Sequence, residues 1–441
     1  MNILIIGGIA AGASVAAKAK RTNPEANVTI IEKNDYLSFG ACGLPYYLGG
    51  EFDNADRMYA RSIEKTKEQG IEVLSRHEAL SIDFDNKKVN IKNLENSEEF
   101  ERVYDKLAIC TGATPVVFGE GSDSENVFTM VKEDDANRLK AKLDEIENIV
   151  VIGAGFIGLE VAEQLVSIGK NVTVVHREND LLKNIFDDEI SEMIKEKAIE
   201  HGIKFKFGNT YESFKTDGNK AIAVITDKEE IPCDAAVMAL GFRPNTSFID
   251  DSRLEKIKNG AIIVDDCGRT SIEDVYSAGD CATVHNKFTN NFYAALATYA
   301  NKMGRLVGEN IVSENQKSYI GALGSSSIKV GEYGATSTGL TEEKAKELGL
   351  NYKATFIKAK NQTSYLKGQE DIFIKLIYDK ETRVILGGQI FGKKGIERIT
   401  ALVVAIHKEV TVDELGFMDF PYSPPFSPTW DPLNVAGNAS K

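Results

Sequence analysis

One unit that occurs twice constrains the fold most: a short apolar run, a glycine-rich turn, a helix-forming segment and a second apolar run. The first copy starts at Met1 and reads NILIIGG, IAAGASVAAKAKR and NVTIIEK. The second starts near Glu147 and reads NIVVIGAGFIGLEVAEQLVSIGKNVTVVHRE. Short apolar runs on either side of a glycine turn and a helix predict a parallel β-α-β unit. Two such units predict two dinucleotide-binding folds in one chain.

The rest of the chain indicates more than one domain, because 441 residues exceed what a single hydrophobic core covers. Three further runs, YDKLAICTGATP, AAVMALGFRPN and DVYSAGDCA, read as strands that end in glycine turns. From about Gly321 the pattern alternates, which predicts antiparallel strands followed by the helix GIERITALVVAIHKE. We therefore expect an α/β fold with two Rossmann-like dinucleotide-binding domains and a C-terminal α+β domain.

The tail FPYSPPFSPTWDPLNVAGN carries five of the ten prolines. Proline lacks a backbone N–H and interrupts helix interiors and inner strands. We therefore expect the whole tail to be extended and laid against another surface.

The composition excludes several classes of protein. A formal net charge of -14, from 52 basic and 66 acidic residues, argues against nucleic-acid binding, which needs a basic surface. No apolar run approaches the roughly 20 residues that span a bilayer, so we expect no membrane insertion. The five cysteines are widely spaced and match neither a zinc site nor a disulfide framework. We expect a cytoplasmic protein with reduced thiols and no metal site.

The first glycine turn, Gly7-Gly8-Ile9-Ala10-Ala11-Gly12, keeps the outer glycines of the G-x-G-x-x-G pattern. Gly7 permits the tight turn, Gly12 lets helix and strand pack closely, and the helix N-terminus attracts a pyrophosphate. Glu32, at the end of the next strand, suits a ribose hydroxyl. A tight turn with a solvated glutamate is the alternative. Asp280, after a later strand, suits a ribitol or phosphate-bridging role, with a turn-forming aspartate as the alternative.

The second turn, Gly153-Ala154-Gly155-Phe156-Ile157-Gly158, matches the pattern fully. His176 and Arg177 follow its second strand, where an acid would be expected for a ribose 2′-hydroxyl. Basic residues there favour a 2′-phosphate, and so NADPH over NADH, unless Glu178 serves as the acid. Two dinucleotide folds imply one flavin and one nicotinamide.

The motifs GGIAAG, IIEK, SFGACGLPYY, CTGATP, GAGFIGLE, ALGFRPN and YSAGDCA resemble, in this order, those of the pyridine nucleotide-disulfide oxidoreductases. The single cysteine in SFGACGLPYY resembles the branch of coenzyme A-disulfide reductases, NADH oxidases and NADH peroxidases. The resemblance implies FAD and NAD(P)H, a homodimer, an FAD-binding domain at 1–111 and 244–318, an NAD(P)H-binding domain at 112–243 and a dimerisation domain at 319–441. The cofactor-binding residues expected from the motifs are Gly7, Gly8, Ala11, Gly12, Glu32, Lys33, Thr111, Gly112, Gly153, Gly155, Phe156, Ile157, Gly158, His176, Arg177, Gly241 and Asp280.

Within this branch the chain is most similar to the coenzyme A-disulfide reductases. Oxidases and peroxidases typically carry a histidine in the first turn, where this chain has Ala10 and Ala11. The reductases carry tyrosines that resemble Tyr365 in NQTSYLKG and Tyr422 in PYSPPFS, and the resemblance brings both to the site from the other subunit. It also implies that coenzyme A contacts Arg21, Ser38 and Phe39.

A single cysteine can support disulfide exchange if the substrate supplies the second sulfur. Cys42 would form a mixed disulfide with the substrate thiol, which the flavin, reduced by NADPH, would resolve. A position close to a helix N-terminus would lower the pKa of its thiol. The first alternative is an oxidase that reduces oxygen through a Cys42 sulfenate. The second is an electron-transfer reductase for a small iron-sulfur protein, which needs no active cysteine. The other cysteines, Cys110, Cys233, Cys267 and Cys281, are expected to be buried structural thiols.

Overall fold

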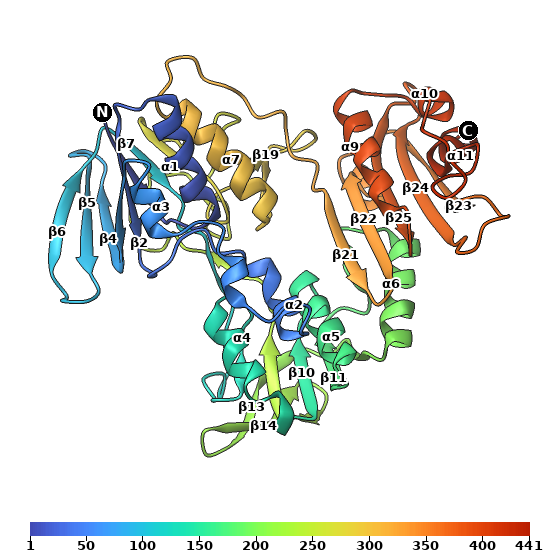
Figure 1. Cartoon of the computed structure of the whole chain (residues 1–441), viewed down its shortest axis with the longest axis horizontal. Coiled ribbons are helices and arrows are strands. Elements are labelled where there is room, and N and C mark those ends of the chain that lie inside the picture. Colours follow the sequence, from blue (N-terminus) through green and yellow to red (C-terminus); the bar gives the residue numbers. More distant parts are fainter. The chain divides into compact units, whose positions relative to one another are not determined.

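The computed structural model describes all 441 residues (Figure 1). Contacts within the chain divide it into two compact units. The first unit comprises Met1–Leu44, Phe52–Val116 and Gly241–Ala322. The second comprises Pro45–Glu51, Val117–Leu240 and Leu323–Lys441. The division into three domains expected from the sequence stays a prediction.

The first unit is built on a five-stranded parallel sheet with the order β18-β7-β1-β2-β3. The strands are Val275–Ser277 (β18), Lys106–Ile109 (β7), Asn2–Ile6 (β1), Asn27–Glu32 (β2) and Ile71–Ser75 (β3). Alternate residues of β1 enter two different cores, Ile3 and Ile5 on one face and Leu4 and Ile6 on the other. Because both faces are covered, the strand reads as a continuous apolar run.

Helices α1 (Ala10–Thr22) and α7 (Ala297–Asn310) pack against each other in this unit. A Cβ atom at Gly304 would lie 2.5 Å from the carbonyl oxygen of Ala11, and one at Gly308 would lie 2.4 Å from that of Val15. The small residues of both helices therefore permit their close approach. The remaining elements of the unit are α3 (Ile63–Lys67), the antiparallel sheet β4 (His77–Asp83), β5 (Lys88–Asn93) and β6 (Glu99–Val103), the pair β8 (Ala113–Pro115) and β17 (Phe242–Pro244), and the pair β19 (Val284–His285) and β20 (Asn291–Phe292).

The second unit contains another five-stranded parallel sheet, with the order β12-β11-β10-β16-β9. The strands are Lys204–Phe207 (β12), Asn171–His176 (β11), Asn148–Ile152 (β10), Ala235–Met238 (β16) and Val127–Phe128 (β9). The other elements of this part are α2 (Leu44–Leu48), which begins in the first unit, α4 (Glu133–Lys140), α5 (Phe156–Ser167), α6 (Asp188–His201) and the antiparallel sheet β13 (Tyr211–Asp217), β14 (Lys220–Thr226) and β15 (Glu230–Pro232).

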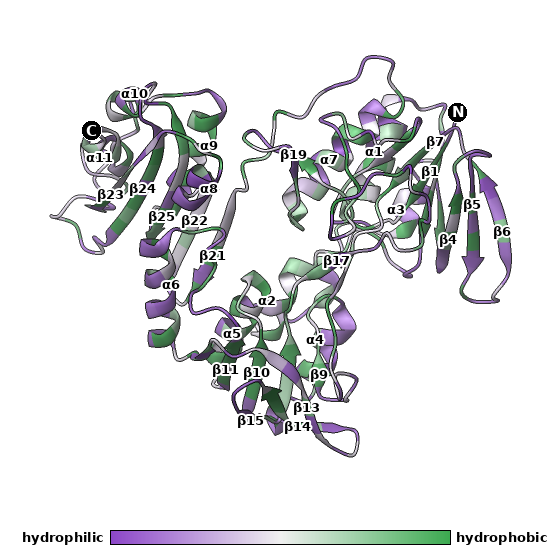
Figure 2. Cartoon of the chain, turned by 180° about the vertical axis from the view of Figure 1, so that it is seen from behind, coloured by the Kyte–Doolittle hydropathy of each residue, from purple (hydrophilic) through white to green (hydrophobic).

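The C-terminal part of the second unit is a five-stranded antiparallel sheet with the order β21-β22-β25-β24-β23. Its elements are β21 (Ser326–Val330), β22 (Tyr333–Gly339), β23 (Tyr352–Lys360), β24 (Asp371–Asp379), β25 (Ile385–Gly392), α8 (Glu342–Glu347), α9 (Ile399–His407), α10 (Val412–Phe417) and α11 (Pro432–Ala439). Inner strand β24 is largely hydrophobic, whereas α6 carries many hydrophilic residues (Figure 2). The α/β fold with two Rossmann-like domains and a C-terminal α+β domain is thus confirmed.

The expectation that the whole tail is extended was wrong at its C-terminal end, because Pro432–Ala439 forms α11. Pro432 occupies the first helical turn, where its missing N–H is not needed. The Asp431 carboxylate caps the helix by accepting a hydrogen bond from the Leu433 N–H at 2.9 Å. Residues 421–430 form neither helix nor strand.

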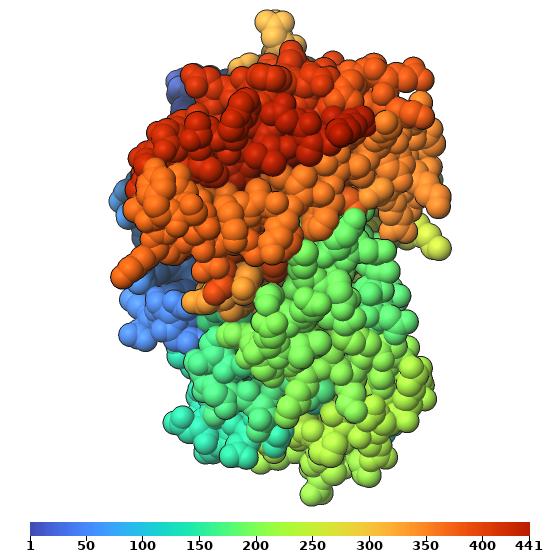
Figure 3. Space-filling model, turned by 90° about the vertical axis from the view of Figure 1, so that its right-hand side faces the viewer, coloured from blue at the N-terminus to red at the C-terminus, as the bar shows by residue number.

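A buried charge cluster joins α6 to the C-terminal sheet within the second unit, where the two pack together (Figure 3). The Lys375 side chain on β24 is 3% exposed, and its Nζ lies 2.6 Å from Glu189, 2.5 Å from Glu342 and 3.5 Å from Asp187. Two hydrogen bonds also join Asp187 to Gln389. The Asp187 N–H donates to Gln389 Oε1 at 2.9 Å, and Gln389 Nε2 donates to the Asp187 carboxylate at 2.7 Å. Helix α6, which follows β11 of the second parallel sheet, is therefore connected to the C-terminal sheet by charged groups.

Candidate active site

The first glycine turn leaves no space for side chains at two of its glycines. Gly7 has a φ of +99°, and a Cβ there would lie 2.2 Å from the carbonyl oxygen of Cys110. A Cβ at Gly12 would lie 1.8 Å from the carbonyl oxygen of Gly7. The backbone of the turn is thus packed directly against its neighbours, as a pyrophosphate-binding turn requires.

Glu32 lies at the end of β2, and its carboxylate faces this turn. It accepts hydrogen bonds from the Gly8 N–H at 2.7 Å and from the Asn34 N–H and Nδ2 at 2.8 and 2.6 Å. Burial raises the pKa of Glu32, and these hydrogen bonds oppose the rise. The sequence did not single out Asn34, although an Asn two residues after a strand-end acid is a recognisable turn signal. Lys33, between the two, is exposed, and its Nζ lies 4.0 Å from Glu78.

The end of the neighbouring strand β7 leads to Thr111 and Gly112. The Thr111 hydroxyl donates to the Asn245 carbonyl at 2.7 Å, and the Asn245 Nδ2 donates to the Thr111 carbonyl at 3.0 Å. Asp280 follows β18, and burial raises the pKa of its carboxyl to about 6. The Tyr293 hydroxyl, which sequence reasoning missed, donates to the Asp280 carbonyl at 3.0 Å.

These residues fit FAD. The closely packed glycine turn, with no space for a Cβ at Gly7 or Gly12, is the cradle that a pyrophosphate needs. Glu32 supplies an acceptor at the end of β2, and Asp280 supplies a buried carboxyl after β18, in the same sheet. The set offers hydrogen-bond acceptors for the sugar hydroxyls and backbone N–H groups for the phosphates.

Cys42 lies in a single 3₁₀ turn, Ala41–Gly43, that leads directly into α2, and it is exposed. The other four cysteines are buried. Burial raises the pKa of Cys110 and Cys281, and it raises the pKa of Cys233 to about 12, so these thiols resist ionisation. Cys42 is therefore the one cysteine that solvent and a substrate can reach in this structure.

Two of the expected substrate residues lie just before Cys42. Ser38 has a φ of 53°, and its carbonyl accepts the Ala60 N–H at 3.0 Å. Phe39 is buried among aromatic rings, 5.5 Å from Tyr36 and 5.0 Å from Tyr59 between ring centroids. Arg21 lies in the last turn of α1 and is exposed.

The second glycine turn repeats the geometry of the first. Gly153 has a φ of +105°, and a Cβ at Gly158 would lie 2.0 Å from the carbonyl oxygen of Gly153. Gly155 caps α5, and a Cβ there would meet open space. Phe156 and Ile157 form the first turn of α5. The turn fits a second dinucleotide.

His176 and Arg177 lie beside this turn, at the end of β11. The Ala154 N–H donates to His176 Nδ1 at 3.4 Å, and burial lowers the pKa of His176. Arg177 is exposed and lies 3.0 Å from Glu178. Gly241, with a φ of +90°, belongs to the first unit, where its carbonyl accepts the Val116 N–H at 2.9 Å.

Glu160 is a further candidate residue that sequence reasoning missed. Burial, with a contribution from the neighbouring Glu163, raises the pKa of its carboxyl to about 7. A carboxyl that titrates near neutrality on α5, directly after the nucleotide turn, is a candidate proton carrier. Its only sequence signal was the acid that follows the glycine turn in GFIGLE.

The structure brings Tyr365 and Tyr422 together. Their hydroxyl oxygens lie 3.3 Å apart, although the residues are 57 positions apart in the chain. Thr363 holds the two segments together, since its hydroxyl donates to the Pro424 carbonyl at 3.1 Å. The side chains are 70% and 49% exposed. The hydrogen bond between the two hydroxyls raises the pKa of Tyr422, so the Tyr422 phenol stays protonated at neutral pH.

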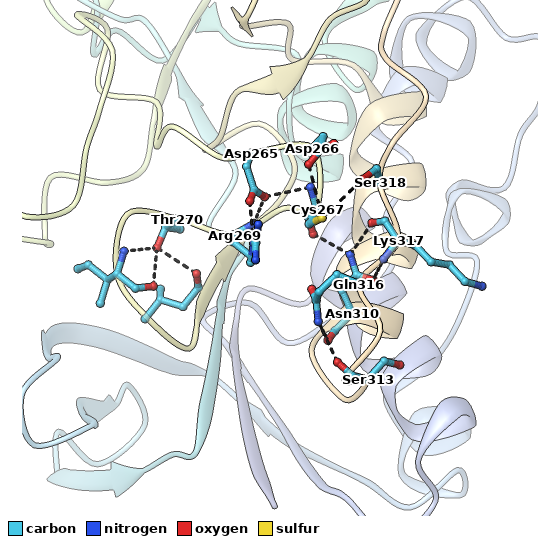
Figure 4. Close-up of polar contacts among 12 residues, drawn as sticks. Asp265, Asp266, Cys267, Arg269, Thr270, Asn310, Ser313, Gln316, Lys317 and Ser318 are labelled. Carbon is cyan, nitrogen blue, oxygen red and sulfur yellow. Dashed lines mark hydrogen bonds and ion pairs between the residues drawn. The ribbon is translucent and has the colours of Figure 1, made fainter.

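Asp265, Asp266 and Cys267 place their side-chain ligand atoms within 4.8 Å of one another (Figure 4). Asp265 accepts hydrogen bonds from the Cys267 and Arg269 N–H groups, both at 2.9 Å, and pairs with the Arg269 side chain at 2.7 Å. Asn310 donates to the Cys267 carbonyl at 3.0 Å. These contacts stabilise a turn, and Cys267 is buried within it.

Comparisons with known proteins identify the family. A family model described as pyridine nucleotide-disulphide oxidoreductase matches residues 1–304, and the dimerisation domain of that family matches residues 325–432. The chain belongs to the pyridine nucleotide-disulphide oxidoreductases. The resemblance inferred from the motifs is thereby confirmed, and the protein is an FAD-dependent NAD(P)H oxidoreductase with a dimerisation domain. None of its helices is both long enough and apolar enough to cross a membrane.

Similar members of the family carry two kinds of name. An NADH oxidase of Enterococcus faecalis is 33% identical over 444 residues, which cover 100% of this chain and 99% of that protein. A CoA-dependent NAD(P)H sulfur oxidoreductase of Pyrococcus abyssi is 33% identical over 445 residues, which cover 100% and 98%. The structure of a water-forming NADH oxidase from Lactobacillus brevis bound to NADH superimposes with a TM-score of 0.95, at 33% identity, and the match covers 100% of this chain and 98% of that one.

Proposed function

We propose that this protein uses NADPH to reduce coenzyme A disulfide, or a related persulfide or polysulfide, through a mixed disulfide on Cys42. The observation that carries the proposal is the pair formed by Tyr365 and Tyr422, whose hydroxyls lie 3.3 Å apart on the exposed surface of the C-terminal domain. A disulfide reductase releases one sulfur leaving group in each half of its cycle. That sulfur leaves most easily when it receives a proton as the S–S bond breaks. Two adjacent phenols are suitable donors for that proton.

The chemistry of this chain's own residues follows from Cys42. Its thiolate attacks one sulfur of the substrate disulfide, the S–S bond breaks, and the first thiol leaves with a proton from Tyr422. Tyr365, hydrogen bonded to Tyr422, orients that phenol. Bound FAD would take a hydride from NADPH and supply the electron pair that releases the second thiol from Cys42. The sum is NADPH, a proton and one disulfide converted to NADP⁺ and two thiols.

The same site residues support the choice of ligands. Glu32 and Asp280 would hold FAD, with Ala11 and Lys33 near the turn and the strand end. Arg177 is exposed beside the second glycine turn, where its guanidinium would suit the 2′-phosphate of NADPH. Arg21, exposed on α1, would meet a phosphate of coenzyme A, and Ser38 and Phe39 would flank the thiol.

We further propose a homodimer in which the tail of one subunit reaches the Cys42 site of the other. The dimerisation domain supports this assembly, and so does the exposure of Tyr365 and Tyr422. Extended proline-rich residues lose little conformational entropy on docking, which suits an interface segment.

Reduction of oxygen through a Cys42 sulfenate is the second candidate, because the E. faecalis and L. brevis relatives are named NADH oxidases. In this chain the first glycine turn has Ala10 and Ala11, neither of which can transfer a proton to a peroxide. The electron-transfer reaction with an iron-sulfur protein has no observation in its favour.

The test is anaerobic NADPH oxidation by the FAD-loaded protein with and without coenzyme A disulfide. We expect oxidation that depends on the disulfide, is lost in Cys42→Ser and falls at least about tenfold in Tyr422→Phe. Tyr333→Phe is the matched control, because Tyr333 stacks on Phe391 elsewhere in the same domain, with 5.4 Å between ring centroids. NADPH oxidation that starts only when oxygen is admitted would refute the reductase in favour of the oxidase.

A further inference from the structure

The chain crosses between its two units directly after the redox cysteine. The 3₁₀ turn Ala41–Gly43 carries Cys42 and continues into α2 without a break. Leu44 belongs to the first unit, whereas Pro45–Glu51 belongs to the second, and the chain returns to the first at Phe52. The contacts that hold α2 inside the second unit therefore restrict the turn that carries Cys42.

Helix α4 contacts α2 at Tyr47, whose backbone carbonyl and side chain both take part and which is only 9% exposed. The Lys140 Nζ donates a hydrogen bond to the Tyr47 carbonyl at 2.6 Å and lies 3.9 Å from the centroid of the Tyr47 ring. The Tyr47 hydroxyl donates to Asn137 Oδ1 at 2.9 Å. A cation–π contact and two hydrogen bonds thus converge on one residue five positions after Cys42.

The two residues of α4 are arranged for this contact. Asn137 and Lys140 are three positions apart, so they share one face of the helix. The Asn137 Nδ2 donates to Glu133 at 3.1 Å, which turns its amide oxygen toward the Tyr47 hydroxyl. The Asn137 acceptor is therefore oriented by a contact within α4 itself.

The end of the α2 segment also contacts α5, the helix that opens at the second glycine turn. A Cβ at Gly49 would lie 1.9 Å from Gln164 Oε1, so any larger residue there would displace the Gln164 amide. The Gln164 Nε2 donates to the buried Glu163 carboxylate at 2.6 Å, which keeps its Oε1 toward Gly49. Figure 1 shows α2 next to both α4 and α5.

We propose that Lys140 and Asn137 are positioning residues for Cys42 that act through Tyr47. This inference rests on the proposed function only in taking Cys42 as the redox thiol. Both residues contact Tyr47. Their role is to hold α2, and with it the preceding turn, in one orientation, so that the Cys42 sulfur is presented to its reaction partners in a fixed geometry.

The test compares Lys140→Met with Lys142→Met in the FAD-loaded protein. Lys142 lies two residues further along, carries the same charge and pairs with Glu125 at 3.7 Å. The first readout is the rate at which iodoacetamide alkylates Cys42 in the reduced enzyme across pH 5 to 9, followed on the Cys42 peptide. The second readout is steady-state kinetics, from which kcat and KM for NADPH are determined separately. Tyr47→Phe, which removes one hydroxyl and keeps the ring, and Lys140→Arg complete the set.

We expect Lys140→Met to change the Cys42 alkylation rate at least about fivefold and to lower kcat about tenfold, since a displacement of about 1 Å at a reacting atom can cost as much as 100-fold. KM for NADPH should stay within about twofold, because the nucleotide turn is untouched. Tyr47→Phe should shift both readouts in the same direction, Lys140→Arg should recover most of the loss, and Lys142→Met should resemble the unmodified protein.

Equal effects of Lys140→Met and Lys142→Met would overturn the inference, and so would unchanged alkylation in both Lys140→Met and Tyr47→Phe. If Lys140→Met does not fold, Tyr47→Phe decides the question. If the unmodified enzyme does not reduce coenzyme A disulfide while the alkylation rates still respond, the proposed substrate is wrong and the positioning role stands.

Discussion

Replacing Lys375 by methionine tests how helix α6 is joined to the C-terminal sheet. The ammonium group is almost completely buried and has three carboxylates as neighbours. Glu189 and Glu342 are 40% and 35% exposed and can be hydrated, but Asp187 is 7% exposed and would lose its cation. At 3.5 Å and an effective dielectric constant of about 20, the attraction between Lys375 and Asp187 is about 5 kcal/mol.

The expected loss in the free energy of unfolding is about 3 to 5 kcal/mol at pH 8, the range found when one partner of a buried ion pair is removed. Lys358→Met is the matched control on the neighbouring strand. Lys358 is exposed and pairs with Asp371 at 2.8 Å, so its loss should be no more than about 1 kcal/mol.

The loss should shrink as the pH falls. Burial already raises the pKa of Asp187 above its ordinary value, while Lys375 opposes that rise. An acid with a raised pKa favours the folded state when protonated, at low pH, and loses that contribution as the pH rises through its folded value. Without Lys375 the pKa of Asp187 rises further, so acidification removes the uncompensated charge. Burial lowers the pKa of Lys375, but its hydrogen bonds to Glu189 and Glu342 outweigh burial and raise the pKa above the ordinary 10.5. The stabilisation that the charged Lys375 gives the folded state is therefore lost only above pH 10.5.

The assay is urea unfolding of the FAD-loaded protein at pH 8 and pH 5.5. Trp430 is the only tryptophan, so its fluorescence reports on the C-terminal domain that contains Lys375. A Lys375→Met protein as stable as the unmodified one at pH 8, or a deficit that grows on acidification, would refute the reasoning.

Three further predictions concern the nucleotide sites. Gly158→Ala should abolish NAD(P)H binding and lower the thermal midpoint by several degrees, because its Cβ would lie 2.0 Å from a backbone oxygen. Gly155→Ala, whose Cβ meets open space, should keep the thermal midpoint of the apoprotein. Calorimetry measures the midpoints, and nucleotide titration measures the binding. Asp280→Asn should weaken FAD binding yet stabilise the apoprotein at pH 8. The pKa of Asp280 is raised from 3.8 to about 6, so its ionisation costs stability progressively as the pH rises from 3.8 to 6, and the full cost is present above that range. Equal stability of the two apoproteins at pH 8 would contradict this. Arg177→Ala should raise KM for NADPH about tenfold and leave KM for NADH within about twofold. Steady-state kinetics with both nucleotides test this, and an equal rise in the two KM values would contradict it.

Local patterns determined much of the fold and of the cofactor sites. The two strand–turn–helix units could be read from NILIIGG and NIVVIGAGFIG because close backbone packing admits only glycine at Gly7, Gly12, Gly153 and Gly158. Buried parallel strands consist mostly of apolar residues, so they too are visible in the sequence. The helix at Pro432 was missed because proline was taken as an interruption, although at the first turn of a helix it is compatible with the helix.

What the tertiary structure alone decided is which distant residues meet. Tyr365 and Tyr422 share a hydrogen bond, Lys375 faces Asp187, and Tyr47 lies on the Asn137 and Lys140 face of α4. Nothing in the local sequence around these residues specifies a partner, because a phenol, an ammonium or an amide forms equally good hydrogen bonds with water in the unfolded chain. Their pairing follows from the packing of apolar strands and helices far from them, which brings the polar groups together only once the fold is complete.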